Sequence, residues 1–218
     1  MTYTVRHPRE FPVSRRCFLA GSLAVAGAVA GSARPSDGAA KKTALIAITL
    51  DLEMSAQYPQ RDITEWNFEK GNLDDATKKY AVEAARVAKE RGGLIHFFCV
   101  GRVLEHPSVD WLKEIAAAGH PIGNHTYDHV YVKATKPQET QFRFQRAPWL
   151  IEGLTATEIV ERNIRLTSTA MKTRLGFAPN GFRTPGGFSN GIEDRPDVQQ
   201  PLRVGGIEHQ LFRGAFLA

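Results

Sequence analysis

The chain has 218 residues, of which 42% are hydrophobic and 23% charged, and its formal net charge is +5 at pH 7. This length predicts one folded domain, and the composition is that of an ordinary soluble globular protein. Residues 1–33 hold four arginines and one glutamate, a net charge of +3, so the remainder carries only +2. The positive charge therefore gives no argument for nucleic-acid binding.

The N-terminal residues have the layout of an export signal. Arg15 and Arg16 precede an uncharged apolar run that extends from Cys17 to about Ala30, and small residues follow up to Ala33. A twin arginine before such a run is typical of the twin-arginine export route. A membrane anchor is the alternative, but the run is short for a span and rich in Gly and Ala. We expect a cleaved signal peptide over residues 1–33, no stable membrane span after cleavage, and a periplasmic or extracellular location.

Strands and helices are expected to alternate in the rest of the chain, after a flexible leader at 34–42. Strands are predicted at the apolar runs 43–52, 94–101 and 120–126, and a fourth strand with its loop at 177–187. Helices are predicted at 73–91, 109–118 and 155–175. Ser108 and Thr155 are expected to cap the second and third helices, Thr155 in a capping box with Glu158. This alternation predicts parallel βαβ units and an α/β fold in a domain that covers 43–218.

Three further expectations concern packing. The first helix is predicted to bury Ala76, Tyr80, Ala84, Val87 and Ala88 on one face. The polar stretch 133–153 has the composition of a surface loop, and no helix or strand periodicity is visible beyond Ile192. Cys99 lies in an apolar run and is expected to pack in the core rather than act as a nucleophile.

The polar residues with chemical potential follow the predicted strands. His125 and His129 are four residues apart, so a helical turn or a tight loop would bring both imidazoles to one side. They form a candidate metal pair, although hydrogen bonds to neighbouring backbone would also explain them. Asp51 and Glu53 share one face of their strand because they are two residues apart. One of them could complete a metal site, while the other could deprotonate a metal-activated water molecule.

Three motifs in the same order resemble those of the polysaccharide deacetylases, carbohydrate esterase family 4 with its NodB homology domain. The segment Thr49-Leu50-Asp51-Leu52-Glu53 corresponds to the family's Thr-Phe-Asp-Asp-Gly motif, and His125-Thr126-Tyr127-Asp128-His129 to its His-Ser/Thr-x-x-His motif. Arg183-Thr184-Pro185-Gly186-Gly187 corresponds to its Arg-x-Pro-x-Gly motif. The strand at 94–101 is also similar to one of the family, with His96 in place of a threonine. The resemblance implies a distorted (β/α) barrel whose C-terminal strands are truncated or degenerate in this chain.

The resemblance also implies roles for individual residues. Asp51 corresponds to the catalytic base, His125 and His129 to metal ligands, and Arg183 to the residue that orients the base. Leu52 occupies the position of the family's remaining ligand and cannot bind a metal, so Glu53 is favoured as that ligand, with the reverse assignment of Asp51 and Glu53 as the competitor. The expected ion is zinc, with cobalt or another divalent ion possible.

The implied activity is hydrolysis of acetyl groups on an acetylated amino sugar or polysaccharide. Pro185 and Gly186 of the third motif are expected to contact that substrate. His209 is the remaining candidate for the family's general acid, although its surroundings do not have the pattern of a strand. A cyclic-imide or amide hydrolase of the same superfamily and a non-catalytic carbohydrate-binding relative are the alternatives.

Overall fold

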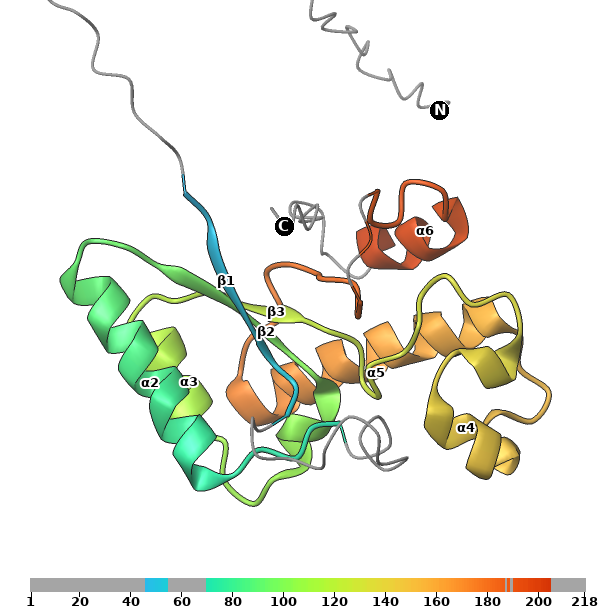
Figure 1. Ribbon diagram of the computed structural model, residues 1–218, viewed down its shortest axis with the longest axis horizontal. Coiled ribbons are helices and arrows are strands. Elements are labelled where there is room, and N and C mark those ends of the chain that lie inside the picture. Colours follow the sequence, from blue (N-terminus) through green and yellow to red (C-terminus); the bar gives the residue numbers. More distant parts are fainter. Residues whose placement is uncertain (1–45, 55–69, 187, 189, 205–218) are drawn as a thin grey trace, which may run out of the picture. The chain divides into compact units, whose positions relative to one another are not determined.

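The computed structural model describes residues 46–54, 70–186, 188 and 190–204 (Figure 1). The predicted signal peptide, the leader at 34–42 and His209 lie outside these residues. The described elements are the strands β1 (Ile48–Leu52), β2 (Ile95–Cys99) and β3 (Ile122–Asn124), and the helices α2 (Asp75–Glu90), α3 (Asp110–Ala117), α4 (Phe142–Arg146), α5 (Ala156–Leu175) and α6 (Pro196–Val204). Short 3₁₀ helices cover Gly101–Glu105, Pro137–Glu139 and Pro148–Ile151.

The strands form one parallel sheet in the order β1-β2-β3. Leu52 of β1 pairs with Cys99 of β2, and Cys99 pairs with Asn124 of β3, so all three carboxyl ends meet at one edge. Helix α2 connects β1 to β2 and α3 connects β2 to β3, which are the crossovers that parallel strands require (Figure 1). The predicted α/β class with parallel βαβ units is confirmed. Within the described part of the chain no strand follows β3.

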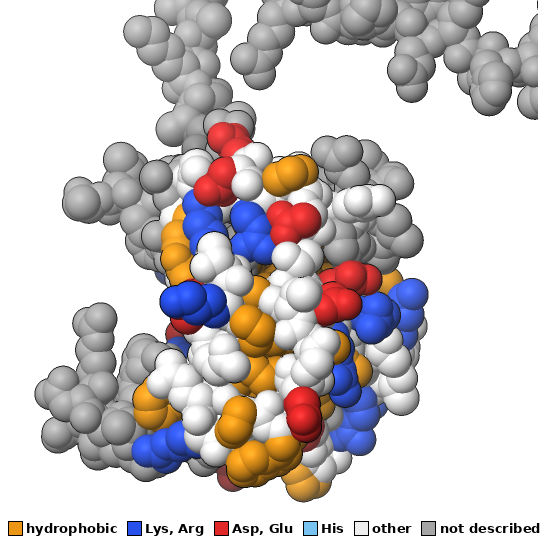
Figure 2. Space-filling model, turned by 90° about the vertical axis from the view of Figure 1, so that its right-hand side faces the viewer, with side chains coloured by type: hydrophobic (Ala, Val, Ile, Leu, Met, Phe, Trp, Pro, Cys, Tyr) orange, Lys and Arg blue, Asp and Glu red, His pale blue; other side chains and the backbone are white. Residues whose placement is uncertain are grey.

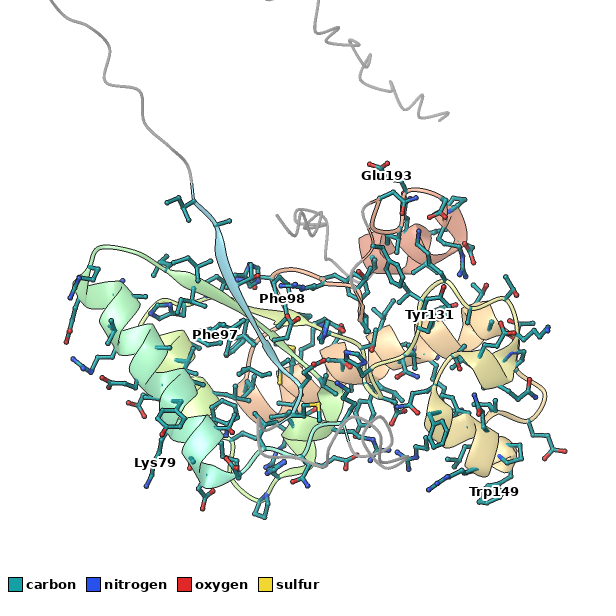
Figure 3. The ribbon with its side chains drawn as sticks, in the orientation of Figure 1. Lys79, Phe97, Phe98, Tyr131, Trp149 and Glu193 are labelled. Carbon is teal, nitrogen blue, oxygen red and sulfur yellow. The ribbon has the colours of Figure 1, made fainter. Side chains whose placement is uncertain are left out.

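The core is centred on β2, whose five residues are all buried. Phe97 and Phe98 have no exposed surface and lie inside the domain, whereas Trp149 is 68% exposed and lies at its periphery (Figure 3). Cys99 is also fully buried and unpaired, which confirms its expected core position. Burial raises the pKa of its thiol, so it is a poor nucleophile.

The predicted buried face of α2 is right only in part, since Ala84 and Ala88 are half-buried and pack against the core. Ala81 and Ala85 are the buried positions, while Tyr80 is 73% exposed and Val87 41% exposed. Alanines occur on several sides of this helix, so they do not define one face. The contact with the sheet and with α3 selects Ala81 and Ala85 instead.

The second half of the chain is more ordered than the sequence suggested. The stretch 133–153, predicted as a surface loop, contains α4 and two 3₁₀ helices and buries Phe144 and Ile151. In place of the fourth strand, Phe182 makes one isolated bridge to Asn124. Helix α6, where no periodicity was recognised, packs on α5 through Val198 and Leu202. These pieces are too short for periodicity to show, and burial by neighbouring elements decides their conformation.

Helix ends follow local chemistry more closely. Thr155 and Glu158 form the expected capping box of α5, and Gly176 closes the helix with a positive φ of 86°. Helix α3 differs, because Val109 is its N-cap and the Ser108 hydroxyl accepts from the Asp110 N–H instead. Both ends of α5 are therefore encoded locally, and this helix supports the loop that carries His125 and His129.

Candidate metal centre

The two carboxylates stand at the carboxyl end of β1. Asp51 is the fourth residue of the strand and Glu53 follows its last residue. Leu52 between them is 4% exposed and belongs to the hydrophobic core. The alternation of a strand thus sends Leu52 into the core, and Asp51 and Glu53 away from it, as expected.

His125 follows β3 directly and is 1% exposed. Its N–H donates to the carbonyl of Cys99 on the neighbouring strand, and its Nδ1 lies 2.9 Å from the carbonyl oxygen of Arg183. A protonated Nδ1 that donates to this carbonyl leaves the Nε2 lone pair directed at the site. Metal-binding histidines are oriented in this way.

A tight loop, not a helical turn, brings His129 beside His125. Thr126 and His129 both have positive φ values, 61° and 56°, which non-glycine residues adopt only when the surroundings enforce them. The Asn124 side chain accepts from the Thr126 N–H at 2.8 Å and donates to the Ile164 carbonyl of α5. Asn163 of the same helix accepts from the N–H of Asp128, the residue before His129. Helix α5 therefore holds the strained loop that carries both imidazoles.

The side chains of Glu53, His125 and His129 converge. Their ligand atoms all lie within 4.8 Å of one another, and in the described part of the chain no other such group of three includes these types of residue. Glu53 Oε2 is 2.5 Å from His129 Nε2 and 3.6 Å from His125 Nε2. The two imidazole rings meet edge to face with their centroids 5.0 Å apart.

Asp51 lies beside this group rather than within it. Its Oδ2 is 3.8 Å from His125 Nε2 and 3.4 Å from Arg183 Nε. Arg183 is itself fixed by a 2.6 Å hydrogen bond to the Thr49 hydroxyl. The other carboxylate oxygen, Oδ1, is buried and has no hydrogen-bond partner among the described residues. A buried acceptor without a partner in a polar site indicates room for a group such as water or a metal-bound ligand.

Two imidazole nitrogens and one carboxylate oxygen form a ligand set that suits zinc and leaves a position open for water. Burial raises the pKa of Glu53, but hydrogen bonds with His125 and His129 and the nearby charge of Lys70 outweigh it and hold this pKa well below its usual range. Burial lowers the pKa of His129, and the Glu53 carboxylate offsets this only in part. An ionised carboxylate at Glu53 and a neutral imidazole at His129 are the protonation states in which these groups bind a metal, so they fit the ion.

Sequence reasoning missed Lys70. This lysine is 3% exposed, and its Nζ lies 3.1 Å from Glu53 Oε1. A single lysine before Gly71-Asn72 belongs to none of the recognised motifs, so no local signal could have singled it out. Only the packing of the chain against the end of β1 shows that it belongs to the site.

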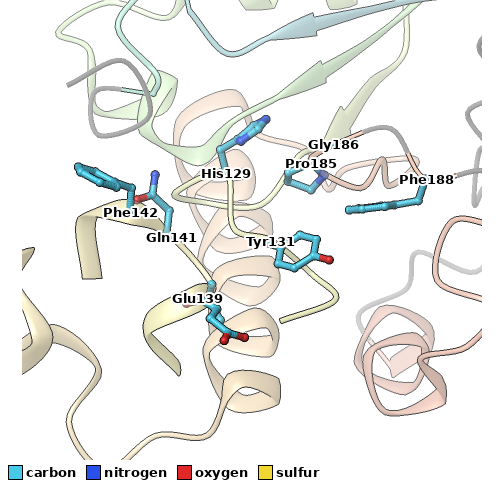
Figure 4. A pocket seen from close by; sticks show the side chains of 9 residues that line it. His129, Tyr131, Glu139, Gln141, Phe142, Pro185, Gly186 and Phe188 are labelled. Atoms are coloured by element: carbon cyan, nitrogen blue, oxygen red, sulfur yellow. The ribbon is translucent and has the colours of Figure 1, made fainter. Parts of the chain in front are cut away.

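A pocket of about 370 Å³ opens next to His129 (Figure 4). Pro185 and Gly186, predicted to contact substrate, form part of its wall, and Tyr131 and Phe188 add aromatic rings whose centroids are 5.6 Å apart. The remaining lining residues are Glu139, Thr140, Gln141 and Phe142. Sequence reasoning missed these last four residues because they belong to the stretch 133–153, which was predicted to be a surface loop.

The family model for polysaccharide deacetylase matches residues 72–194, more than half of the chain. The chain belongs to the polysaccharide deacetylase family. The matched segment includes His125, His129 and Arg183, while Asp51 and Glu53 precede it.

Individual relatives match more distantly. A chitooligosaccharide deacetylase from Azorhizobium caulinodans is 29% identical over 90 residues, and the alignment covers 41% of each chain. Among solved structures, a family 4 carbohydrate esterase from Streptomyces lividans in complex with acetate is 15% identical, with a TM-score of 0.41 and coverage of 74% of this chain and 59% of that one. A family 4 pseudoenzyme from Bacillus anthracis is also 15% identical, with a TM-score of 0.42 and coverage of 72% and 40%. The chain thus spans less than two thirds of the length of each of these relatives.

No helix in the described ranges of this polysaccharide deacetylase family member is long and apolar enough to cross a membrane. Figure 2 shows basic and acidic side chains interspersed over one face of the domain. That face carries no extended patch of a single charge.

Proposed function

We propose that the chain is a metal-dependent deacetylase that hydrolyses acetyl groups on an acetylated amino sugar or polysaccharide. The observation that carries this proposal is the convergence of Glu53, His125 and His129, with the Asp51–Arg183 pair directly beside them. Membership of the polysaccharide deacetylase family supports it. The name of the Azorhizobium relative, a chitooligosaccharide deacetylase, favours an N-acetylated sugar chain as the substrate.

Each residue has a distinct part in this reaction. Glu53, His125 and His129 would hold a divalent ion, which would lower the pKa of water and polarise the acetyl carbonyl. Asp51 accepts a proton from the attacking water at Oδ1, the oxygen without a partner among the described residues. Arg183 lies 3.4 Å from the opposite oxygen, Oδ2, and so fixes the Asp51 carboxylate beside His125. Hydrolysis then breaks the carbon–nitrogen bond, with the hydroxyl passing to the acetyl carbon and a proton to the amine.

The pocket next to His129 is the place for the sugar. Tyr131 and Phe188 line this pocket with aromatic rings against which the apolar face of a sugar ring can bind, and Glu139 and Gln141 offer acceptors for hydroxyl groups. Pro185 and Gly186 line this pocket and closely follow Arg183 in the chain, which supports their assignment to substrate contact. We take zinc as the ion, and cobalt as a substitute with similar ligand preferences.

The direct test is acetate release from N-acetylated chitooligosaccharides by the purified protein, first treated with a chelator and then supplied with zinc or cobalt. We expect release only with metal, and its loss in Asp51→Asn, which keeps the shape of the side chain but cannot accept the proton. Asp110→Asn is the matched control, because Asp110 lies on α3 with its side chain 79% exposed. Sugar binding without acetate release in the metal-loaded protein would show a non-catalytic carbohydrate-binding protein instead, and release from a cyclic imide alone would show the amide-hydrolase alternative.

The location is a separate part of the proposal. Arg15, Arg16 and the uncharged run after them support export by the twin-arginine route. We expect the protein in the periplasm or outside the cell with its N-terminus near residue 34. Replacing both arginines by lysine should retain it in the cytoplasm, and unchanged export would contradict this assignment.

A further inference from the structure

The two carboxylates of the site are each paired with one cation. Arg183 lies against Oδ2 of Asp51, the oxygen that also lies 3.8 Å from His125 Nε2. Lys70 lies against Oε1 of Glu53, which leaves Oε2 facing His125 and His129. The first cation belongs to a recognised motif, but the second does not.

The chain around Lys70 is built to bring it to this place. The Gly71 N–H donates to the Glu53 carbonyl at 2.6 Å, and the Gly71 carbonyl lies 2.9 Å from His106 Nε2. Gly71 has a φ of 96°, and a Cβ atom at this position would lie 2.4 Å from Cβ of Arg102. Only glycine permits this approach, so the backbone contact and the lysine contact act together on Glu53.

Glu53 needs such a restraint more than an aspartate would. A glutamate has one rotatable bond more than aspartate, so its carboxylate can reach more positions and orientations. A carboxylate free to rotate could present either oxygen, or both, to an ion. The Lys70 ammonium, whose side chain is only 2% exposed, makes a charge-assisted contact that holds one of them.

We propose that Lys70 is a positioning residue of the metal centre, which holds Oε1 of Glu53 so that a single oxygen, Oε2, binds the ion together with His125 and His129. This inference rests on the proposed function, because it takes Glu53 as a metal ligand. It adds a fourth side chain to the site and ties the segment that precedes α2 to metal binding. Residues that hold a ligand in this way typically alter metal affinity about 10- to 100-fold when they are replaced.

The test measures zinc affinity by competition with a chelator, and the absorption spectrum of the cobalt-substituted protein, which reports the number of ligands. We expect Lys70→Met to bind zinc about 10- to 100-fold more weakly, and its cobalt spectrum to lose intensity as Oε1 joins the ion and the coordination number rises. Lys70→Arg restores a charged donor and should bind zinc more tightly than Lys70→Met. Lys113→Met is the matched control, because Lys113 pairs with Asp110 at 3.2 Å on the surface and is expected to leave both readouts unchanged.

The outcomes separate the two proposals. If the wild-type protein binds no zinc, the proposed function and this inference both fail. If the wild type binds zinc and Lys70→Met binds it equally well with an unchanged cobalt spectrum, Lys70 has no positioning role, although the metal site stands. Should Lys70→Met fail to fold, the comparison of Lys70→Arg with Lys70→Gln decides in the same way, with weaker binding expected for the glutamine.

Discussion

The replacement Glu53→Gln tests the assignment of the two carboxylates directly. Glutamine has the size and shape of glutamate, so it fills the same space but carries no charge. The change removes the ion pair with Lys70 at 3.1 Å and the negative charge that faces His129 at 2.5 Å. It should lower both the stability of the metal-free protein and the affinity for zinc.

The loss of stability follows from the burial of the pair. Breaking a buried ion pair by removing one partner costs about 3–5 kcal/mol of unfolding free energy. Lys70 is 2% exposed but the Glu53 side chain is 26% exposed, so solvent screens the pair in part and the lower end, about 3 kcal/mol, applies. At about 2–4 °C per kcal/mol for a domain of this size, the melting temperature should fall by roughly 6–12 °C.

The assay is thermal unfolding in the presence of a chelator, followed by measurement of zinc bound per chain after metal is restored. Glu53→Gln should melt at a lower temperature than the wild type. Its affinity for zinc should fall by more than the roughly 100-fold that follows from replacing a residue that only holds a ligand in place. Asp51→Asn should keep its zinc, because Asp51 lies beside the ligand group. The reasoning is refuted if Glu53→Gln retains zinc while Asp51→Asn loses it, which would exchange the two roles.

Two further predictions concern the residues that support the site. Asn124→Ala leaves the buried N–H of Thr126 without its acceptor and should lower the unfolding free energy, measured by urea denaturation, by about 1–3 kcal/mol. Zinc binding should also weaken, because Thr126 begins the strained loop. Equal stability of variant and wild type would show that the loop does not depend on Asn124. His96 stacks on Phe98 in the core, and burial lowers its pKa from 6.5 to about 4. Burial disfavours the protonated form of His96 in the folded state, so its contribution to the unfolding free energy is fully present above pH 6.5. This contribution is lost as the pH falls towards 4, and the loss reaches up to about 3 kcal/mol at about 1.4 kcal/mol per pKa unit. The variant His96→Phe should remove that part of the acid sensitivity, and an unchanged difference in stability between pH 7 and pH 4 would show that His96 is not its source.

The sequence alone determined the features that depend on near neighbours. The capping box at Thr155 and the left-handed Gly176 involve residues within one turn, so local chemistry sets both ends of α5. The apolar run around Cys99 indicated a buried parallel strand, and β2 is one, because a strand buried on both faces needs no alternation. The run before Leu52 indicated the same for β1, but Ile48 and Leu50 of this strand are 49% and 38% exposed. The spacing of Asp51 and Glu53 put them on one face for a reason equally local, the twofold repeat of a strand.

The tertiary structure decided what depends on distant partners. Ala81 rather than Tyr80 faces the core because the sheet and α3 select the face, and alanine itself distinguishes none. Lys70 joins the site because Gly71 lets the backbone reach Glu53, a contact that no spacing in the sequence encodes. The different places of the two carboxylates in the site have the same origin, since Arg183 contacts Asp51 and Lys70 contacts Glu53 from other segments of the chain. Residue types and their periods encode which side chains can act, and only packing between distant segments sets which oxygen each one presents.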